Sequence, residues 1–187
     1  NPLTACPAIA AAARAAGVTI RERCTLLALE RDGALWRAKT SAGDILAGRV
    51  VNAAGAAAAK VARMVGLDLA VEGVPIQATV TEAAAPLVPH LVYSAATRLT
   101  LKQMANGTFV IGGGWPSRLS RAGHLTVNPH SLAANMGTAA RTVPAVGRLR
   151  AARSWPAIVN GTADWLPLIG EAPRQKGFYL ALFPWIG

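Results

Sequence analysis

The residues that follow the apolar pair Val50 and Val51 form the arrangement best suited to binding a ligand through the backbone. Asn52 comes first, and residues 53–56 are Ala, Ala, Gly and Ala, so the expected strand ends in four positions with almost no side chain. A helix is expected directly afterwards, over residues 56–65. Such a strand-to-helix turn lets a ligand approach the backbone closely. Tight packing of the strand against the helix explains the same pattern equally well, so the residues alone leave both interpretations open.

Three other motifs carry weaker chemical signals. Residues 112–114 are all Gly and follow an expected strand, but they lack the G-x-G-x-x-G spacing of a nucleotide-binding loop, and Trp115 follows where a helix should begin. We therefore expect a turn that ends the strand. Asp164 lies in a turn-like segment, where a single Asp usually forms an Asx-turn or a cap. Trp185 follows the last expected strand, where a large aromatic residue either fills the core or forms the wall of a pocket for a flat ring.

Cysteine and histidine usage indicates neither a metal site nor a redox pair. Cys6 and Cys24 are 18 positions apart, which is not the spacing of a zinc site or of a C-x-x-C motif. The three His residues do not stand four apart on a helical face, so we expect no bound metal. The sequence also has no local signature of a Ser/His/Asp or Cys/His catalytic site. We expect reduced thiols, and therefore a cytoplasmic protein.

The 187 residues carry a formal net charge of +10, which raises the question of a nucleic-acid partner. The basic residues are scattered singly, however, and aromatic residues do not alternate with them as a stacking surface for bases requires. We therefore predict no nucleic-acid partner, and a basic binding module without enzymatic activity stays as an alternative. The hydrophobic fraction of 52% and the charged fraction of 15% indicate a folded globular chain.

These motifs need a framework of helices and strands to position them. Hydrophobic periodicity and turn residues predict helices over residues 1–16, 56–65 and 129–141, the last one capped by Asn128. Strands are predicted over residues 18–20, 24–31, 34–40, 45–53, 74–81, 91–94, 99–103, 108–112, 150–159 and 178–183. The dipeptides at 32–33 (Asp-Gly) and 106–107 (Asn-Gly) indicate hairpins. This order of elements predicts a mixed α/β or α+β fold.

Six segments in a fixed order resemble the FAD-dependent oxidoreductases of the D-amino-acid oxidase superfamily, with glycine oxidase and the sarcosine oxidase β subunit as the nearest kinds. Residues 50–56 are similar to the family motif vVNAAGAW, with Ala57 in the place of its Trp. The other five segments resemble family motifs over residues 1–13, 17–33, 101–114, 155–170 and 177–187. Together the matches span nearly the whole chain, and they specify the superfamily but not the substrate.

The resemblance implies a two-domain flavoprotein. Residues 1–66 and 162–187 would belong to a Rossmann-like FAD-binding domain, and residues 67–161 to a substrate domain with a mixed, largely antiparallel sheet. The family's G-x-G-x-x-G loop lies upstream of Asn1, so we expect a piece of a longer protein that is poorly stable and unable to hold FAD alone. The FAD contacts that the resemblance implies are the backbone of Leu26 at the adenine, Ala53, Ala54 and Gly55 at the dinucleotide, and Pro184, Trp185, Ile186 and Gly187 at the isoalloxazine ring.

The reaction that the resemblance implies is the oxidation of a small-molecule amine or amino acid. A hydride passes from the carbon that bears the nitrogen to the flavin, which leaves an imine. The electron acceptor would be oxygen or an electron-transfer chain, and the likeness to a β subunit allows a hetero-oligomer. Such enzymes often need no acid–base side chain, so the catalytic residues stay unassigned.

The substrate positions are where this sequence departs from the family. Val159 stands where glycine-oxidase-like members have an Arg that grips the substrate carboxylate. Thr100 replaces an aromatic residue and Lys102 replaces an Arg, and Lys102 is either a cationic partner for the substrate or a solvated strand residue. Trp165 replaces a Gly and either narrows the pocket or only packs. These departures keep open an alternative substrate class for the same fold, namely hydroxy acids or compounds resembling glycerol phosphate.

Overall fold

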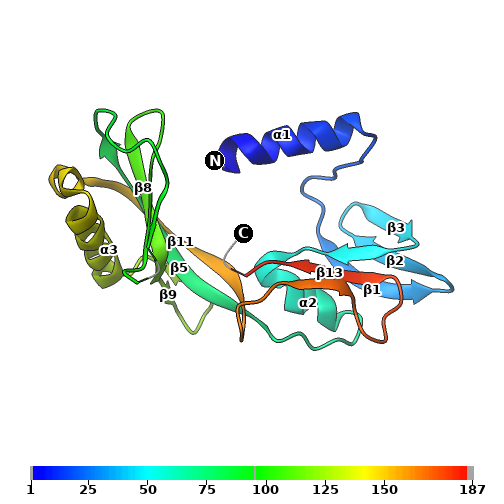
Figure 1. Cartoon of the computed structure of the whole chain (residues 1–187). Coiled ribbons are helices and arrows are strands. Elements are labelled where there is room, and N and C mark those ends of the chain that lie inside the picture. The colour runs from blue at the N-terminus through cyan, green and yellow to red at the C-terminus, as the bar shows by residue number, and fades with distance from the viewer. Residues whose placement is uncertain (1, 95, 185–187) are drawn as a thin grey trace.

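The computed structural model describes residues 2–94 and 96–184 of the 187-residue chain. Its strands form two groups, which the long antiparallel strands β5 (Val71–Ala83) and β11 (Ala151–Thr162) connect (Figure 1). One group contains two three-stranded sheets, and the other contains a five-stranded sheet with a helix on one face. The expected mixed α/β fold is confirmed.

Helix α1 (Pro2–Ala15), drawn in blue in Figure 1, lies beside the rest of the molecule and has no buried residue. Its apolar side chains Leu3 and Ile9 are 80% and 69% exposed. Residues 18–20 form no strand, contrary to the expectation, because no neighbouring strand in the described part of the chain pairs with them. The sequence pattern was therefore right about the helix and wrong about the apolar segment after it.

The first small sheet is the antiparallel series β1 (Leu26–Asp32), β2 (Leu35–Thr40) and β3 (Gly43–Ala47). This confirms the hairpin predicted from the Asp-Gly dipeptide. The guanidinium of Arg37 on β2 donates hydrogen bonds to Asp32 and Asp44, and these bonds raise its pKa. Trp36 is buried against Phe178, with ring centroids 5.9 Å apart, so this sheet packs against the second one.

The second small sheet contains β12 (Leu168–Glu171), β13 (Phe178–Leu182) and β4 (Val50–Asn52), in that order. The strand predicted over residues 45–53 is thus two strands in two sheets, because β3 ends at Ala47 and Val50 begins β4, which pairs in parallel with Phe178. Strand β12 was not predicted, since its residues carry turn signals and become a strand only by pairing with β13.

One face of this second sheet is covered and the other is open. The 3-10 turn η1 (Gly55–Ala57) and helix α2 (Ala58–Arg63) follow β4, and residues of α2 pack beside Leu182 of β13. The predicted helix over 56–65 is therefore present in a shorter form. On the other face, Val51 and Ile169 are 61% and 67% exposed.

The five-stranded sheet has the order β11, β5, β8 (Thr108–Pro116), β7 (Leu99–Gln103) and β6 (Val92–Ser94). Helix α3 (Pro129–Thr142) covers one face and begins at Asn128, whose Oδ1 accepts a hydrogen bond from the backbone N–H of His130 at 3.1 Å. The predicted cap is confirmed. The 3-10 turn η2 (Pro144–Arg148) follows, and a short hairpin of β9 (Arg118–Leu119) and β10 (Leu125–Thr126) precedes α3.

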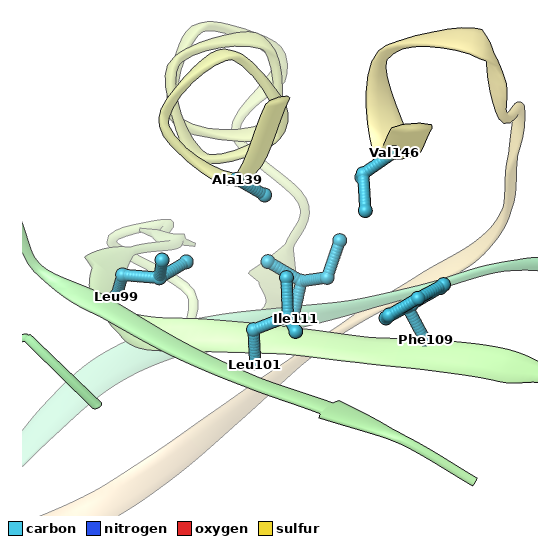
Figure 2. Packing of buried hydrophobic residues seen from close by; sticks show 6 residues of the cluster. All are labelled: Leu99, Leu101, Phe109, Ile111, Ala139 and Val146. Atoms are coloured by element: carbon cyan, nitrogen blue, oxygen red, sulfur yellow. The ribbon is translucent and has the colours of Figure 1, made fainter. Parts of the chain in front are cut away.

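The largest core cluster lies between this sheet and its helix, as Figure 2 shows. Leu99, Leu101, Phe109 and Ile111 point from the sheet toward Ala139 of α3 and Val146 of η2. All six residues are fully buried. This packing fixes which face of the sheet points away from α3, and therefore which residues are available for function.

The three Gly residues at 112–114 form a bulge inside β8 rather than the predicted strand-ending turn. Gln77 and Thr79 of β5 pair with Trp115 and Ile111, so β8 advances by four residues over a distance that β5 covers in two. Gly113 has φ +124, and a Cβ there would lie 2.0 Å from the carbonyl oxygen of Arg98. The glycines are needed because another part of the backbone passes close by, which the sequence pattern does not reveal.

Candidate cofactor and substrate site

The residues expected to approach a dinucleotide lie at the end of a parallel strand pair. Leu180 of β13 pairs with Asn52 of β4, so both strands end at the same edge of their sheet. Residues 53–55 leave β4 at this edge, and Phe183 and Pro184 leave β13 beside them. Ligands of α/β proteins commonly bind at the carboxyl ends of parallel strands. The structure thus brings Ala53, Ala54 and Gly55 to the neighbourhood of Pro184.

Asn52 positions the turn that contains residues 53–55. Its side chain is 2% exposed, and its Nδ2 donates to the carbonyl oxygen of Ala58 at 2.9 Å. Its Oδ1 accepts a hydrogen bond from the backbone N–H of Ala54 at 3.2 Å. Sequence reasoning did not single out Asn52 as a positioning residue, although an Asn at the end of an apolar strand is a usable signal, because Asn is depleted in strands.

The turn itself is open to an incoming group. Ala53 and Ala54 are exposed, and Gly55 has φ +53 in the left-handed region. A Cβ built on Gly55 would meet no heavy atom within 4 Å. The backbone is therefore accessible rather than filled by the packing of β4 against α2, which favours the ligand-binding interpretation of this segment.

Asn160 of β11 connects this edge to the five-stranded sheet. Its side chain is 2% exposed, and its Nδ2 donates to the carbonyl oxygen of Phe183 at 2.8 Å. The turn η1 also contacts both β5 and β11. The open turn and the strand that carries Val159 therefore belong to one region of the molecule, although residues 52 and 160 are far apart in the sequence.

The three expected substrate residues lie on one face of the five-stranded sheet. Leu99 and Leu101 point toward α3, so the alternation along β7 turns Thr100 and Lys102 to the opposite face. The register of β7 with β8, of β8 with β5 and of β5 with β11 places Val159 on that same face. Thr100 and Val159 are half-buried, whereas Lys102 is exposed.

These three residues do not form a compact cluster. Strands β8 and β5 lie between β7 and β11, so Thr100 and Val159 are three strand spacings apart across the sheet, about 14 Å, and the register adds an offset along the strands. Lys102 pairs with Val110, one step further from Val159 along the sheet. The face can therefore be the floor of a broad site, but the three side chains cannot together grip one small carboxylate.

The other expected residues have separate surroundings. Leu26 begins β1, pairs with Thr40 and is half-buried, in a different sheet from the open turn. Pro184 is buried directly after Phe183. Trp185, Ile186 and Gly187 lie outside the described residues.

A large cavity lies away from this region. It has a volume of about 610 Å³ and lies between the loop at residues 84–89 and the hairpin at residues 103–107. Its central polar residue, Gln103, is already committed to the backbone, because its Oε1 accepts hydrogen bonds from the N–H groups of Leu87 and Val88. The lining has no charged side chain, so its volume alone does not make it a functional site.

The described residues contain no group of three or more His, Cys, Asp or Glu side chains placed to hold an ion. Among the same residues, no helix has the length and apolar character needed to cross a membrane. Cys6 and Cys24 are both free thiols.

Comparison with known proteins agrees with this geometry. The family model described as DAO, FAD dependent oxidoreductase, matches residues 1–182. The chain belongs to this family of FAD-dependent oxidoreductases. It is 30% identical over 170 residues to the sarcosine oxidase subunit beta of an Arthrobacter species, a match that covers 90% of this chain and 42% of that protein.

Solved structures give the same assignment. The crystal structure of glycine oxidase from Geobacillus kaustophilus matches with a TM-score of 0.76 and 27% identity, over 95% of this chain and 47% of that one. L-proline dehydrogenase from P. horikoshii has the same fold, with a TM-score of 0.88 and 24% identity, over 97% of this chain and 50% of that one. The chain therefore spans about half the length of the relatives it matches.

Proposed function

We propose that this chain supplies part of the cofactor site and the substrate face of an FAD-dependent enzyme that oxidises a small amine or amino acid at its C–N bond. The observation that carries the proposal is the open turn at residues 53–55, which lies beside the end of β13 and is joined through Asn160 to the sheet that bears Val159. The family match over residues 1–182 supports FAD as the cofactor.

The residues present fit such a cofactor. We assign the approach to the dinucleotide to the backbone of Ala53, Ala54 and Gly55, because small side chains and open space leave these amides accessible. The remaining contacts stay proposals from the family resemblance. They are Leu26 at the adenine and Pro184, Trp185, Ile186 and Gly187 beside the isoalloxazine ring.

The domain division follows the two groups of strands. Residues 1–66 and 162–187 would form part of the FAD-binding domain, and residues 67–161 the substrate domain. The separate cores around Phe178 and around Phe109 support this division. The relatives are about twice as long, so the natural protein would supply further FAD contacts from outside this sequence.

Bound FAD would supply the hydride acceptor, and the oxidised substrate would leave as an imine. The part of this chain is to orient the substrate and to exclude water with the half-buried face around Thr100 and Val159. Lys102 is exposed at the edge of that face and is available to an anionic group of the substrate. No acid–base residue is assigned, because hydride transfer to a cofactor does not require one from the protein.

The assembly and the location of the protein are further parts of the proposal. The relative from Arthrobacter carries the name of a β subunit, which supports a hetero-oligomer for this protein too. The two free thiols agree with a reducing compartment such as the cytoplasm. Oxygen or an electron-transfer chain would be the final electron acceptor.

The test uses the natural protein that contains this sequence. It should purify with bound FAD, and anaerobic addition of amines and amino acids should bleach the flavin absorbance. Val159 in the place of the family Arg keeps open a second substrate class, hydroxy acids or compounds resembling glycerol phosphate, so the panel includes both. Bleaching by members of that second class alone would select it over amines, and a protein without flavin would refute the proposal.

A further inference from the structure

A second, smaller cavity lies beside the β5–β11 pair, close to Val159. Its volume is about 160 Å³, and its lining includes Glu72 and Val74 of β5 together with Gly161 and Trp165. Glu72 and Gly161 are direct partners in the register of the two strands, and Val74 pairs with Val159. The cavity thus adjoins the expected substrate face, but its lining residues are not among the cofactor and substrate contacts that the family resemblance implies.

Trp165 forms the wall of this cavity in an unfavourable backbone conformation. Its φ is +59, in the left-handed region that bulky residues rarely adopt. Hydrogen bonds within residues 162–166 fix the turn. Asp164 Oδ1 accepts from the N–H of Leu166 at 3.0 Å, and Thr162 Oγ1 donates to the carbonyl oxygen of Leu166 at 3.0 Å. Strain of this kind persists where the surrounding structure enforces it, and it is concentrated at functional sites.

The missing side chain at Gly161 makes room for the Trp165 ring. A Cβ at residue 161 would lie 3.0 Å from Cη2 and 3.2 Å from Cζ3 of Trp165, which is closer than ordinary contact. The outer ring of Trp165 therefore lies directly over the Gly161 backbone. The side chain is nevertheless 41% exposed, so it forms a wall that solvent reaches and does not fill the core.

Glu72 brings an uncommitted negative charge to the same cavity. Seven of the nine acidic residues in the chain accept hydrogen bonds from Arg, Lys or backbone N–H groups. Within the described residues, the carboxylate of Glu72 makes no hydrogen bond or ion pair, and Asp68 is the other acidic residue whose side chain has none. In a chain with a net charge of +10, a carboxylate left free beside an aromatic wall is available to a cationic ligand.

We propose that Glu72 and Trp165 form a binding site for a compact organic ammonium group, such as an N-alkylated amine. An aromatic face attracts a cation through its quadrupole, and a nearby carboxylate adds direct charge attraction. A volume of about 160 Å³ holds a group of roughly five non-hydrogen atoms, since one water takes up about 30 Å³ in the liquid. The claim that this site recognises the amine of the enzyme's substrate rests on the proposed function. The claim that it binds an ammonium group does not.

The test measures binding without a redox reaction. Choline is titrated into the purified protein by calorimetry, with 3,3-dimethylbutan-1-ol as a neutral ligand of the same shape. Choline should bind saturably and at least about tenfold more tightly than the alcohol, because the cation contributes both attractions. Equal binding of the two ligands, or no saturable binding of choline, would overturn the proposal.

Variants separate the site from a general charge effect. Glu72→Gln and Trp165→Gly should each weaken choline binding about tenfold. Gly161→Ala should also weaken it, because the new Cβ displaces the ring while the indole remains in the chain. Asp68→Asn removes the same charge from the other uncommitted acid and should leave the affinity unchanged. A loss with Asp68→Asn equal to that with Glu72→Gln would refute the site.

Stability gives an independent readout. Gly is favoured at φ +59, so Trp165→Gly should keep or raise the melting temperature while choline binding falls. A lower melting temperature would show that Trp165 only packs, and the proposal would fail. Flavin content and substrate-driven bleaching are measured separately, so failure of the ammonium site and failure of the proposed oxidoreductase activity are distinguishable.

Discussion

Removal of the Asn52 side chain should loosen the turn that we assign to the cofactor. Asn52→Ala eliminates the 2.9 Å hydrogen bond to the Ala58 carbonyl and the 3.2 Å hydrogen bond from the Ala54 N–H. Each such bond contributes about 1 kcal/mol, so the free energy of unfolding should fall by about 2 kcal/mol. For a protein of this size the melting temperature should drop by about 4–8 °C.

The same variant should weaken FAD binding by the natural protein. Without Asn52 the Ala54 amide is no longer fixed, and the turn must be ordered when the cofactor binds. We expect the Kd for FAD to rise about tenfold, which corresponds to 1.4 kcal/mol. Thermal unfolding measures the first effect, and titration of the apoprotein with FAD, followed by flavin fluorescence, measures the second.

A matched control distinguishes a local effect from general destabilisation. Asn135 on α3 is also 2% exposed, and its Nδ2 donates to the carbonyl oxygen of Gly112 at 2.9 Å. Asn135→Ala should lower the melting temperature as well. It should leave the Kd for FAD unchanged, because α3 lies on the face of the five-stranded sheet opposite to the proposed substrate face. Equal rises in Kd for the two variants would refute the reasoning, as would a melting temperature unaffected by Asn52→Ala.

Three further predictions follow from other parts of the structure. Gly113→Ala should lower the free energy of unfolding by about 3 kcal/mol, because the new Cβ would collide with the Arg98 carbonyl. Gly123→Ala, at φ +81 in open space, should lower it by only about 1 kcal/mol, and denaturant unfolding compares the two variants. Gln103→Leu should raise the hydrogen-exchange rates of the Leu87 and Val88 amides about tenfold, and unchanged rates would contradict the assigned hydrogen bonds. Val159→Arg should lower the KM of carboxylate-bearing substrates relative to simple amines in steady-state assays, because a guanidinium there can bind a carboxylate with two hydrogen bonds. An equal change of KM for both substrate types would argue against placing residue 159 at the substrate carboxylate.

Local sequence signals predicted the elements that need no distant partner. The Asp-Gly turn gave the hairpin of β1 and β2, and Asn128 marked the start of α3. Elements defined by pairing were not predictable in this way. The apolar segment at 18–20 has no partner strand among the described residues and is not a strand, whereas residues 168–171 carry turn signals and become β12 beside β13.

The candidate site likewise has features that local sequence signals indicate and features that depend on distant partners. The small residues after β4 left ligand approach and tight packing of the strand against the helix equally open, and the structure shows that this turn is open. The hydrogen bonds that position it could not be read from the sequence, because Asn160 and Phe183 meet only through the tertiary fold. The cofactor and substrate contacts of the named residues stay predictions until they are measured.

Hydrogen exchange at the amides of Ala53, Ala54 and Gly55, with and without FAD in the natural protein, tests the central claim most directly. If the cofactor lies against this turn, these three amides should exchange more slowly when FAD is bound, while the hairpin at residues 103–107 should be unaffected. Unchanged exchange at residues 53–55 in a protein shown to be saturated with FAD would contradict the account.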